Sequence, residues 1–523
     1  MKIEFSGGSG TVTGSSHLLK VNGKSVLLDC GLYQGKDEKT RGNDVFPFIP
    51  SKIDYIVLSH AHIDHSGRIP LLYKRGFRGE IFLTPPAKDL ATILLLDSAH
   101  IHEQDAEWEN KKRERKNLTP VEPLYDLEDA KASIKCFKEL EFNLPYEIFD
   151  GFTINFKEAG HMLGAAITEI FINEEGKEYK LVYSGDLGNK NIPLIKDPDK
   201  IDKADFLIIE TTYGNRLHPN SSKEHEELLR IINDTYKRGG NTIIPSFAVG
   251  RTQELIYILN DFMKAGRLEK GVKIYVDSPL ASKSTEIFKK NRKYFDEESQ
   301  NKIKRGENVL DFPNLYFTES VEDSIILNNT KRGAVIISAS GMATAGRIRH
   351  HLKHNLWRKE SSIVFVGYQA EGSLGRIIQE GANQVTLFGD EIKINAEVHS
   401  FTGLSGHADR NGLYEWIKSF KTYPKEIFLT HGEPEAREAM RSLLVSDGYD
   451  VKVPNQGYIA SINEDIDIKS LTTDFYEYRS PVEVAIKNLR RKEKLIKYIE
   501  NINFDNESTN SIMIQLENIL LDR

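Results

Sequence analysis

The stretch VLSHAHIDHSG, residues 57–67, places three histidines and one aspartate within six residues. These four residues are His60, His62, Asp64 and His65. Chance clustering on a polar loop would explain them, and so would a metal site. Because His60 and His62 lie two apart on a predicted extended segment, their side chains should point to one side. Asp64 and His65 follow in the turn, so the stretch can supply ligands to two neighbouring metal ions.

The bulk composition limits the kind of protein. A chain of 523 residues is too long for one hydrophobic core, so we expect two or more domains. No apolar run is long enough to cross a bilayer, and the N-terminus has no signal-peptide core, so we expect no membrane contact and a cytoplasmic location. Cys30 and Cys136 are the only cysteines, which argues against a disulfide framework. A metal site must therefore use histidines and carboxylates.

The net charge of −7 argues against a protein that coats nucleic acid with its whole surface. A nucleic acid could still bind in a local groove. The basic cluster at residues 111–116 is predicted to be a solvated helix face.

The pattern of predicted strands and helices changes twice along the chain. Up to about residue 212, short β-rich runs end at polar or Pro/Gly stops. Residues 213–396 alternate strand and helix, which indicates a compact parallel α/β domain. The strand pattern of the first part resumes in EIFLTHGE, residues 426–433, so the simplest topology is a second domain inserted into the first. The tail, residues 465–523, is predicted to be helical, with a capping box at Ser480–Pro481.

Three further metal-ligand candidates lie at predicted strand ends. They are His161 in KEAGHMLGAA, Asp186 in LVYSGDLG and His431 in IFLTHGE. Any one alone would be an ordinary loop residue, but a two-metal site needs about six or seven ligands in all. A carboxylate at Asp186 could bridge two metals. Neutral imidazoles with carboxylates suit two Zn²⁺ ions, with Mn²⁺ or iron as alternatives.

The hexapeptide HAHIDH, together with His161, Asp186 and Asp29 of VLLDCG, resembles the metallo-β-lactamase superfamily. The resemblance implies an α/β fold, an αββα sandwich. It also implies an arrangement of ligands: His60, His62 and His161 on one metal, Asp64, His65 and His431 on the other, and Asp186 between them. Asp29 would orient a ligand histidine.

The inserted domain resembles the β-CASP group of nucleic-acid nucleases. Its hallmarks match Glu210 in IIETTYG, His407 in LSGHAD and His431 in LTHGE. The resemblance is strongest to the RNA-cleaving branch, which includes bacterial and archaeal relatives of the cleavage and polyadenylation nuclease. It implies a parallel sheet flanked by helices. The expected domains are 1–212 and 397–464 for the two parts of the metallo-β-lactamase domain, 213–396 for the β-CASP insertion and 465–523 for a helical extension.

The expected activity is a zinc-dependent ribonuclease acting on single-stranded RNA, as an endonuclease or a 5′–3′ exonuclease. His407 would be the general acid and Glu210 would hold its ring. The products would carry a 5′-phosphate and a 3′-hydroxyl. A homodimer is compatible with the sequence.

The stretch SASGMA, residues 338–343, is predicted to end a strand and open a helix whose backbone N–H groups cradle a substrate phosphate. Helix capping by Ser340 is the alternative. The predicted phosphate contacts are Ser338, Ser340, Gly341, Arg347 and Arg376, the last two from the family pattern.

Three other functions compete. A small-molecule metallohydrolase would need neither the inserted domain nor the Glu210 and His407 pair. A non-catalytic scaffold subunit of an RNA-processing complex would be expected to have lost ligands, yet every expected position is filled. A DNA nuclease of the same group tends to have an apolar residue where this chain has His431.

Overall fold

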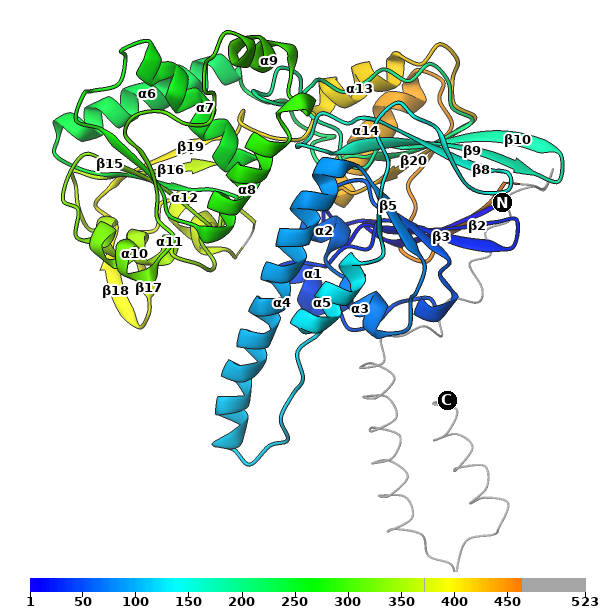
Figure 1. Cartoon of the computed structure of the whole chain (residues 1–523), viewed down its shortest axis with the longest axis horizontal. Helices are drawn as coiled ribbons and strands as arrows, with labels where there is room; N and C mark the ends of the chain where they lie inside the picture. Colours follow the sequence, from blue (N-terminus) through cyan, green and yellow to red (C-terminus); the bar gives the residue numbers. More distant parts are fainter. Residues whose placement is uncertain (371, 463–523) are drawn as a thin grey trace, which may run out of the picture.

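The computed structural model describes residues 1–370 and 372–462, and Figure 1 gives the arrangement of its elements. The predicted capping box at Ser480–Pro481 and the predicted helical extension 465–523 lie outside the described residues. None of the helices in the described part is long and apolar enough to cross a membrane.

Two seven-stranded sheets form the first part of the fold, which we call the two-sheet body. The first sheet has the order β22-β1-β2-β3-β4-β5-β6. Its strands are β1 (Lys2–Gly7), β2 (Ser16–Val21), β3 (Lys24–Leu28), β4 (Tyr55–Val57), β5 (Glu80–Leu83), β6 (Phe137–Glu139) and β22 (Ile459–Ser461).

The second sheet has the order β21-β20-β11-β10-β9-β8-β7. Strands β10, β11 and β20 are parallel neighbours, so their carboxyl ends meet at one edge of the sheet. Its strands are β7 (Tyr146–Phe149), β8 (Phe152–Glu158), β9 (Ala166–Glu174), β10 (Lys177–Tyr183), β11 (Phe206–Glu210), β20 (Glu426–Thr430) and β21 (Val451–Lys452).

The two sheets pack face to face because alternate residues of their strands are apolar. Phe5 and Phe82 of the first sheet share one buried cluster with Phe156 and Phe428 of the second. Helices cover the outer faces, which gives the predicted αββα sandwich (Figure 1). The helices are α1 (Lys36–Arg41), α2 (Ile63–Ser66), α3 (Ile69–Lys74), α4 (Pro85–Glu114), α5 (Leu127–Ile134), α13 (Arg410–Lys418) and α14 (Pro434–Ser446), with a 3-10 turn at Pro50–Lys52.

The inserted domain has a six-stranded sheet of order β14-β13-β15-β12-β16-β19, in which every pair is parallel. Its strands are β12 (Thr242–Pro245), β13 (Lys273–Val276), β14 (Leu315–Phe317), β15 (Ala334–Ser338), β16 (Ser362–Val366) and β19 (Glu397–Phe401), and β17 (Gln384–Leu387) and β18 (Asp390–Lys393) form a hairpin. Its helices are α6 (Ser221–Lys237), α7 (Arg251–Lys264), α8 (Pro279–Lys290), α9 (Glu297–Lys304), α10 (Val321–Asn328), α11 (Ile348–Asn355) and α12 (Leu374–Gln379), with a 3-10 turn at Arg292–Tyr294.

The sheet of the inserted domain extends beyond the boundary predicted at residue 396. Strand β19 pairs with β16 from Ser362 opposite Glu397 to Val366 opposite Phe401. It is an edge strand and only Phe401 in it is buried, so it lacks the apolar run typical of a central parallel strand. We therefore take residues 213–401 as the inserted domain.

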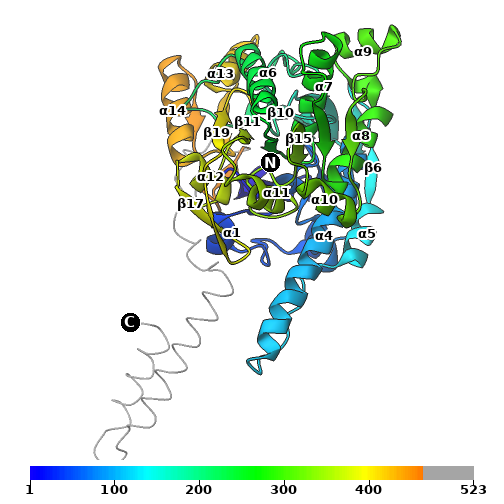
Figure 2. The same ribbon diagram turned by 90° about the vertical axis from the view of Figure 1, so that its left-hand side faces the viewer.

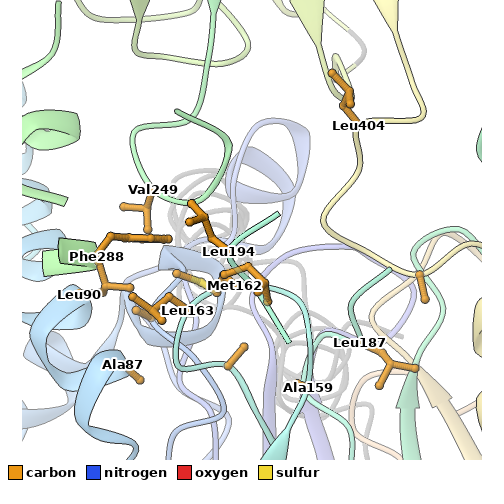
Figure 3. Close-up of a cluster of buried hydrophobic side chains, with 14 of the residues drawn as sticks. Ala87, Leu90, Ala159, Met162, Leu163, Leu187, Leu194, Val249, Phe288 and Leu404 are labelled. Carbon is orange, nitrogen blue, oxygen red and sulfur yellow. The ribbon is translucent and has the colours of Figure 1, made fainter. Parts of the chain in front are cut away.

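An apolar cluster joins the two-sheet body to the inserted domain. Figure 3 shows Leu90 of α4 and Met162 of the body near Phe288 of α8 and Val249 of the inserted domain. All four side chains are buried in one continuous cluster. Asp89 adds polar contacts across the same boundary, to Lys290 at 2.9 Å and to Asn291 at 2.8 Å. The two parts therefore pack as one body around the site between them.

The second half of α4 extends past both sheets, as Figure 1 shows. Residues 111–116 at its end are almost all exposed, as a solvated helix face requires.

Candidate metal centre

The histidine-rich stretch lies at the end of β4, between the two sheets and the inserted domain. Strand β4 ends at Val57, so His60 lies in the following loop and His62 is the residue before α2. Asp64 and His65 are in the first turn of α2. The short helix turns these two side chains to a second position, as the sequence predicts.

One group of ligand atoms gathers around His62. Its Nδ1 lies 3.1 Å from Nε2 of His60 and 3.1 Å from Nε2 of His161. Oδ2 of Asp186 lies 3.5 Å from Nε2 of His60. His161 follows β8 and Asp186 follows β10, so two strands of the second sheet, with β9 between them, deliver both residues to the stretch after β4.

A second group gathers beside it. Nε2 of His65 lies 3.2 Å from Nε2 of His431 and 3.2 Å from Oδ2 of Asp186. Oδ2 of Asp64 lies 3.5 Å from Nε2 of His431. His431 is the first residue after β20. The same oxygen of Asp186 therefore faces both groups.

Both groups fit a metal ion. In a tetrahedral zinc site with Zn–N distances of about 2.0–2.1 Å, two ligand nitrogens lie about 3.3 Å apart, close to the spacings in each group. In each of the two groups, one ligand atom per residue lies within 4.8 Å of the others. Asp186 is 2% exposed, and among the described residues its Oδ1 makes no hydrogen bond, although Nδ1 of His431 lies 3.3 Å away. Such a buried carboxylate favours a bound cation.

His60 and His161 are held in the form that binds metal. Burial lowers the pKa of His60 and of His161 well below the usual value, so both rings are neutral at pH 7. Only a neutral imidazole offers a lone pair to a metal.

Asp29 connects the ligands from behind. Its Oδ2 accepts hydrogen bonds from Nδ1 of His65 at 2.7 Å, from the Tyr183 hydroxyl at 2.6 Å and from the Ser59 hydroxyl at 2.7 Å. Ser59 in turn lies 3.0 Å from Nδ1 of His60. One fully buried carboxylate thus fixes a ring in each group of ligands.

His407 and Glu210 lie next to the ligands. Nδ1 of His407 lies 2.9 Å from Oε1 of Glu210, and the His407 ring packs against His161 with centroids 4.4 Å apart. Glu210 is buried at the end of β11 and also accepts the backbone N–H of Leu187 at 2.7 Å. Burial alone would lower the pKa of His407, but the carboxylates of Glu210 and Asp186 outweigh it and raise that pKa to about 9.

The predicted phosphate contacts lie in a different local structure from the one expected. Strand β15 ends at Ser338, but α11 begins only at Ile348. The prediction that SASGMA opens a helix is therefore wrong, and so is helix capping by Ser340. Instead a loop closes on itself, because Ser340 N donates to the carbonyl of Ala345 and Ala343 N donates to that of Ser340. Small residues favour tight turns as well as helix starts, and here they form a turn.

The side chains of these residues already have partners. The Ser338 hydroxyl is buried and donates to the Asp277 carbonyl at 2.8 Å. Arg347 pairs with the Asp277 carboxylate at 2.8 Å, and Arg376 with Glu380 at 2.6 Å. Phosphate binding by this group remains a prediction. Of these residues Gly341 is buried and Ser340 is half-buried, whereas the Arg376 side chain is 41% exposed.

Sequence reasoning missed Ser59 and Tyr183. Ser59 directly precedes the histidine stretch, and its position there was the signal that could have found it. Tyr183 is the last residue of β10, three before Asp186, and nothing local indicates that its hydroxyl reaches a residue 154 positions earlier.

Three family models match the chain in order. They are the metallo-β-lactamase superfamily domain over residues 18–191, the Beta-Casp domain over 252–378 and the Zn-dependent metallo-hydrolase RNA specificity domain over 391–454. Together they cover both parts of the two-sheet body and most of the inserted domain.

Three relatives align with most of this chain. Ribonuclease TTHA0252 of Thermus thermophilus is 35% identical over 457 residues, which cover 87% of this chain and 99% of that protein. Transcription termination factor FttA of Methanocaldococcus jannaschii is 31% identical, over 83% of this chain and 67% of that protein. The FttA of Methanosarcina mazei is 30% identical over the same shares.

A solved structure supports the fold alone. A crystal structure of a protein of unknown function from Enterococcus faecalis matches with a TM-score of 0.50 at 13% identity, and covers 88% of this chain and 99% of its own. The near full-length match to a relative at 35% identity and the ordered family matches lead to one assignment. The chain belongs to the β-CASP group of the metallo-β-lactamase superfamily.

Proposed function

We propose that this chain is a metal-dependent ribonuclease that hydrolyses phosphodiester bonds of single-stranded RNA, internally or from the 5′ end. The observation that carries the proposal is the placement of two metal-ligand groups that share Asp186, with the His407 and Glu210 pair directly beside them. A relative named as a ribonuclease, similar over nearly its whole length, supports the choice of RNA.

We propose two Zn²⁺ ions as the native metals. His60, His62 and His161 would hold one ion, and Asp64, His65 and His431 the other, with Asp186 between them. Bound ions would supply activation of a water molecule near neutral pH and would offset negative charge on the phosphoryl oxygens. The same histidine and carboxylate donors can also bind Mn²⁺ or iron, but they are less typical of those metals than of zinc.

His407 would protonate the leaving oxygen. Because Nδ1 of His407 is bonded to Glu210, the proton available to a substrate is on Nε2. Cations at Asp186 would offset the effect of that carboxylate on the ring, so Glu210 is the group that keeps His407 charged. The products would then carry a 5′-phosphate and a 3′-hydroxyl.

The His407→Ala variant tests the acid. We expect two metal equivalents per chain to be retained, because His407 is in neither ligand group, while RNA turnover falls by about 10²- to 10⁴-fold. Metal content by mass spectrometry and single-turnover cleavage measure the two effects. As a matched control, Glu210→Gln keeps the size and the hydrogen-bonding capacity of the partner but removes its charge. Near wild-type turnover of His407→Ala would contradict the role.

RNAs labelled at either end test the substrate. Metal-loaded protein is incubated with strands that carry a 5′-monophosphate, a 5′-triphosphate or a 5′-hydroxyl, and with single-stranded DNA of the same sequence. The size ladder separates internal cleavage from stepwise cleavage at the 5′ end. Chelation should abolish cleavage and added Zn²⁺ or Mn²⁺ should restore it. The proposal fails if none of these RNAs is cleaved by protein with a full metal content.

A further inference from the structure

Three arginines surround the glycine-rich loop at residues 7–14, outside the metal centre. The guanidinium of Arg437 lies against Gly10, where a β-carbon would be 2.9 Å from Arg437 Nη2 and 4.0 Å from Arg41 Nη2. Arg41 also lies 5.7 Å above the Tyr33 ring, and Arg68 lies 5.1 Å from that ring. Arg41 comes from α1 and Arg437 from α14, which Figure 2 shows toward the same edge of the molecule.

Two of these cations are buried without a carboxylate. Arg68 is 1% exposed and Arg437 is 4% exposed. Among the described residues neither forms an ion pair, and Nη2 of Arg68 and Nε of Arg437 have no hydrogen-bond partner. Other donors of the two side chains bind backbone carbonyls, Arg68 those of Gly31 and Val45 and Arg437 that of Pro454. No carboxylate of the described residues offsets either buried charge, which favours an anion that binds from outside.

The loop itself adds neutral donors. The Ser9 hydroxyl is buried next to Gly10 and has no partner among the described residues. Gly8 and Gly10 adopt φ of 64° and 84°, in the left-handed region that backbone anion sites use. Asp37, 3.8 Å from Arg41, is the one acidic group paired with this cluster in the described residues. Burial and the charge of Arg41 both lower the pKa of Arg437, as expected for a cation that lacks an anion.

The loop is attached directly to the second ligand group. The backbone N–H of His431 donates to the Gly8 carbonyl at 2.6 Å, and that of Ser15 donates to the Asp64 carbonyl at 2.9 Å. Arg437 follows His431 by six residues. An anion held at Gly10 would therefore lie close to the metal centre, on the side of Asp64 and His431. The side chain of Arg41 is 26% exposed and Gly10 is partly exposed, so this end of the cluster is open to solvent.

We propose that Arg41, Arg437 and the loop at Ser9–Gly10 form a binding site for a phosphate group of the RNA, separate from the scissile phosphate. The planar guanidinium groups and the loop donors match the oxygens of a tetrahedral phosphate. The site would hold either a phosphodiester of the strand next to the cleaved bond or a terminal 5′-phosphate. The inference rests on the proposed ribonuclease function and names one of its substrate contacts.

The test couples one charge on the RNA to one arginine. A short single-stranded RNA is made with an uncharged methylphosphonate at one linkage at a time, and with a 5′-phosphate or a 5′-hydroxyl. We expect wild-type kcat/KM to fall about 10- to 100-fold at one position only, the loss for one charge-assisted contact. Arg41→Ala should show the same fall on the unmodified RNA and no further fall at that position. Its binding to the RNA should also lose about 0.7 in the slope of log affinity against log salt.

Controls separate this site from the fold and from the catalytic centre. Lys39→Ala removes an exposed cation from the same helix and should keep the dependence on the linkage charge. Bis(p-nitrophenyl) phosphate reaches only the metals, so Arg41→Ala should hydrolyse it at the wild-type rate. Because Arg437 is buried, Arg437→Gln is compared with the wild type only if the two proteins have the same melting temperature. Arg41→Ala is the main test variant.

Each outcome decides one proposal. Coupling to an internal linkage or to the 5′-phosphate supports the site and identifies the source of the phosphate. Equal losses at every linkage in wild type and Arg41→Ala would overturn it. If the protein hydrolyses the small diester but no RNA, the ribonuclease function fails, and the site is then judged by the salt dependence of RNA binding alone.

Discussion

Single side chains set the chemistry of the metal centre, and Asp29 shows how. The residue adopts a left-handed backbone conformation with φ of 60°, which turns its carboxylate under His65. The same oxygen receives Tyr183 and Ser59, so both ligand groups depend on it. Orientation of a ligand histidine by Asp29 was expected from the family resemblance. The link through Ser59 to His60 was not.

Asp29→Asn should weaken metal binding by about 10- to 100-fold, because the amide cannot accept from His65, Tyr183 and Ser59 at once. Asparagine tolerates the left-handed conformation, so the backbone is kept. Competition with a chelator measures the affinity. Tyr183→Phe removes one of the three hydrogen bonds and should have a smaller effect. Unchanged affinity in Asp29→Asn would contradict this role.

Elements differ in how far local sequence defines them. The strands that end at ligand residues were predicted because apolar runs stop at His, Asp or Gly. The segment after β15 was predicted wrongly, because small residues suit both a helix start and a closed turn, and the contact of Ser340 with Ala345 decides between them. Strand β19 was placed outside the inserted sheet because pairing with β16, not its composition, makes it a strand.

Glu158, at the end of β8, makes this element sensitive to pH. Burial raises the pKa of its carboxyl to about 7, although Lys196 lies 3.3 Å away and opposes the shift. The folded-state pKa lies above that of the unfolded chain. Stability should therefore be unaffected by this group below about pH 4.5 and fall as pH rises from there through 7.

Glu158→Gln stays neutral, so it should remove that loss. We expect its free energy of unfolding to match wild type near pH 5 and to exceed it above pH 7, by on the order of 1–3 kcal/mol. Urea unfolding at several pH values checks the expectation. A gain that is the same at pH 5 and pH 8 would point to packing instead of charge.

At the scale of the whole molecule, the two-sheet body and the inserted domain pack together around one site. The apolar cluster that contains Leu90, Met162 and Phe288 runs from the two-sheet body into the inserted domain (Figure 3). Because the contact is apolar and continuous, the two parts should unfold together. Glu210 and His407 flank the inserted domain in sequence, so this contact also fixes the position of the acid.

Phe288→Ala should therefore destabilise the whole chain, by about 3–5 kcal/mol, the usual cost of emptying a buried phenylalanine site. Calorimetry should show one transition at a lower temperature. Phe171→Ala on β9, where the side chain is 39% exposed, is the control and should change little. Two separate transitions in the wild-type protein would contradict the idea of one cooperative unit.

The sequence by itself determined seven candidate positions for metal ligands, their residue types and the insertion of one domain into another. It could do so because the ligands stand next to strand ends, where a local pattern of apolar run and polar stop marks each of them. Two pairs of these residues, His60 with His62 and Asp64 with His65, are also close in sequence, so their spacing alone carries information.

Only the tertiary structure decided which of these residues meet and what supports them. The shared oxygen of Asp186, the contact of Tyr183 with Asp29 and the meeting of Arg41 with Arg437 join residues far apart in the chain. Such contacts arise when two sheets and their loops pack together. No local propensity encodes them, because each partner alone reads as an ordinary strand, loop or helix residue.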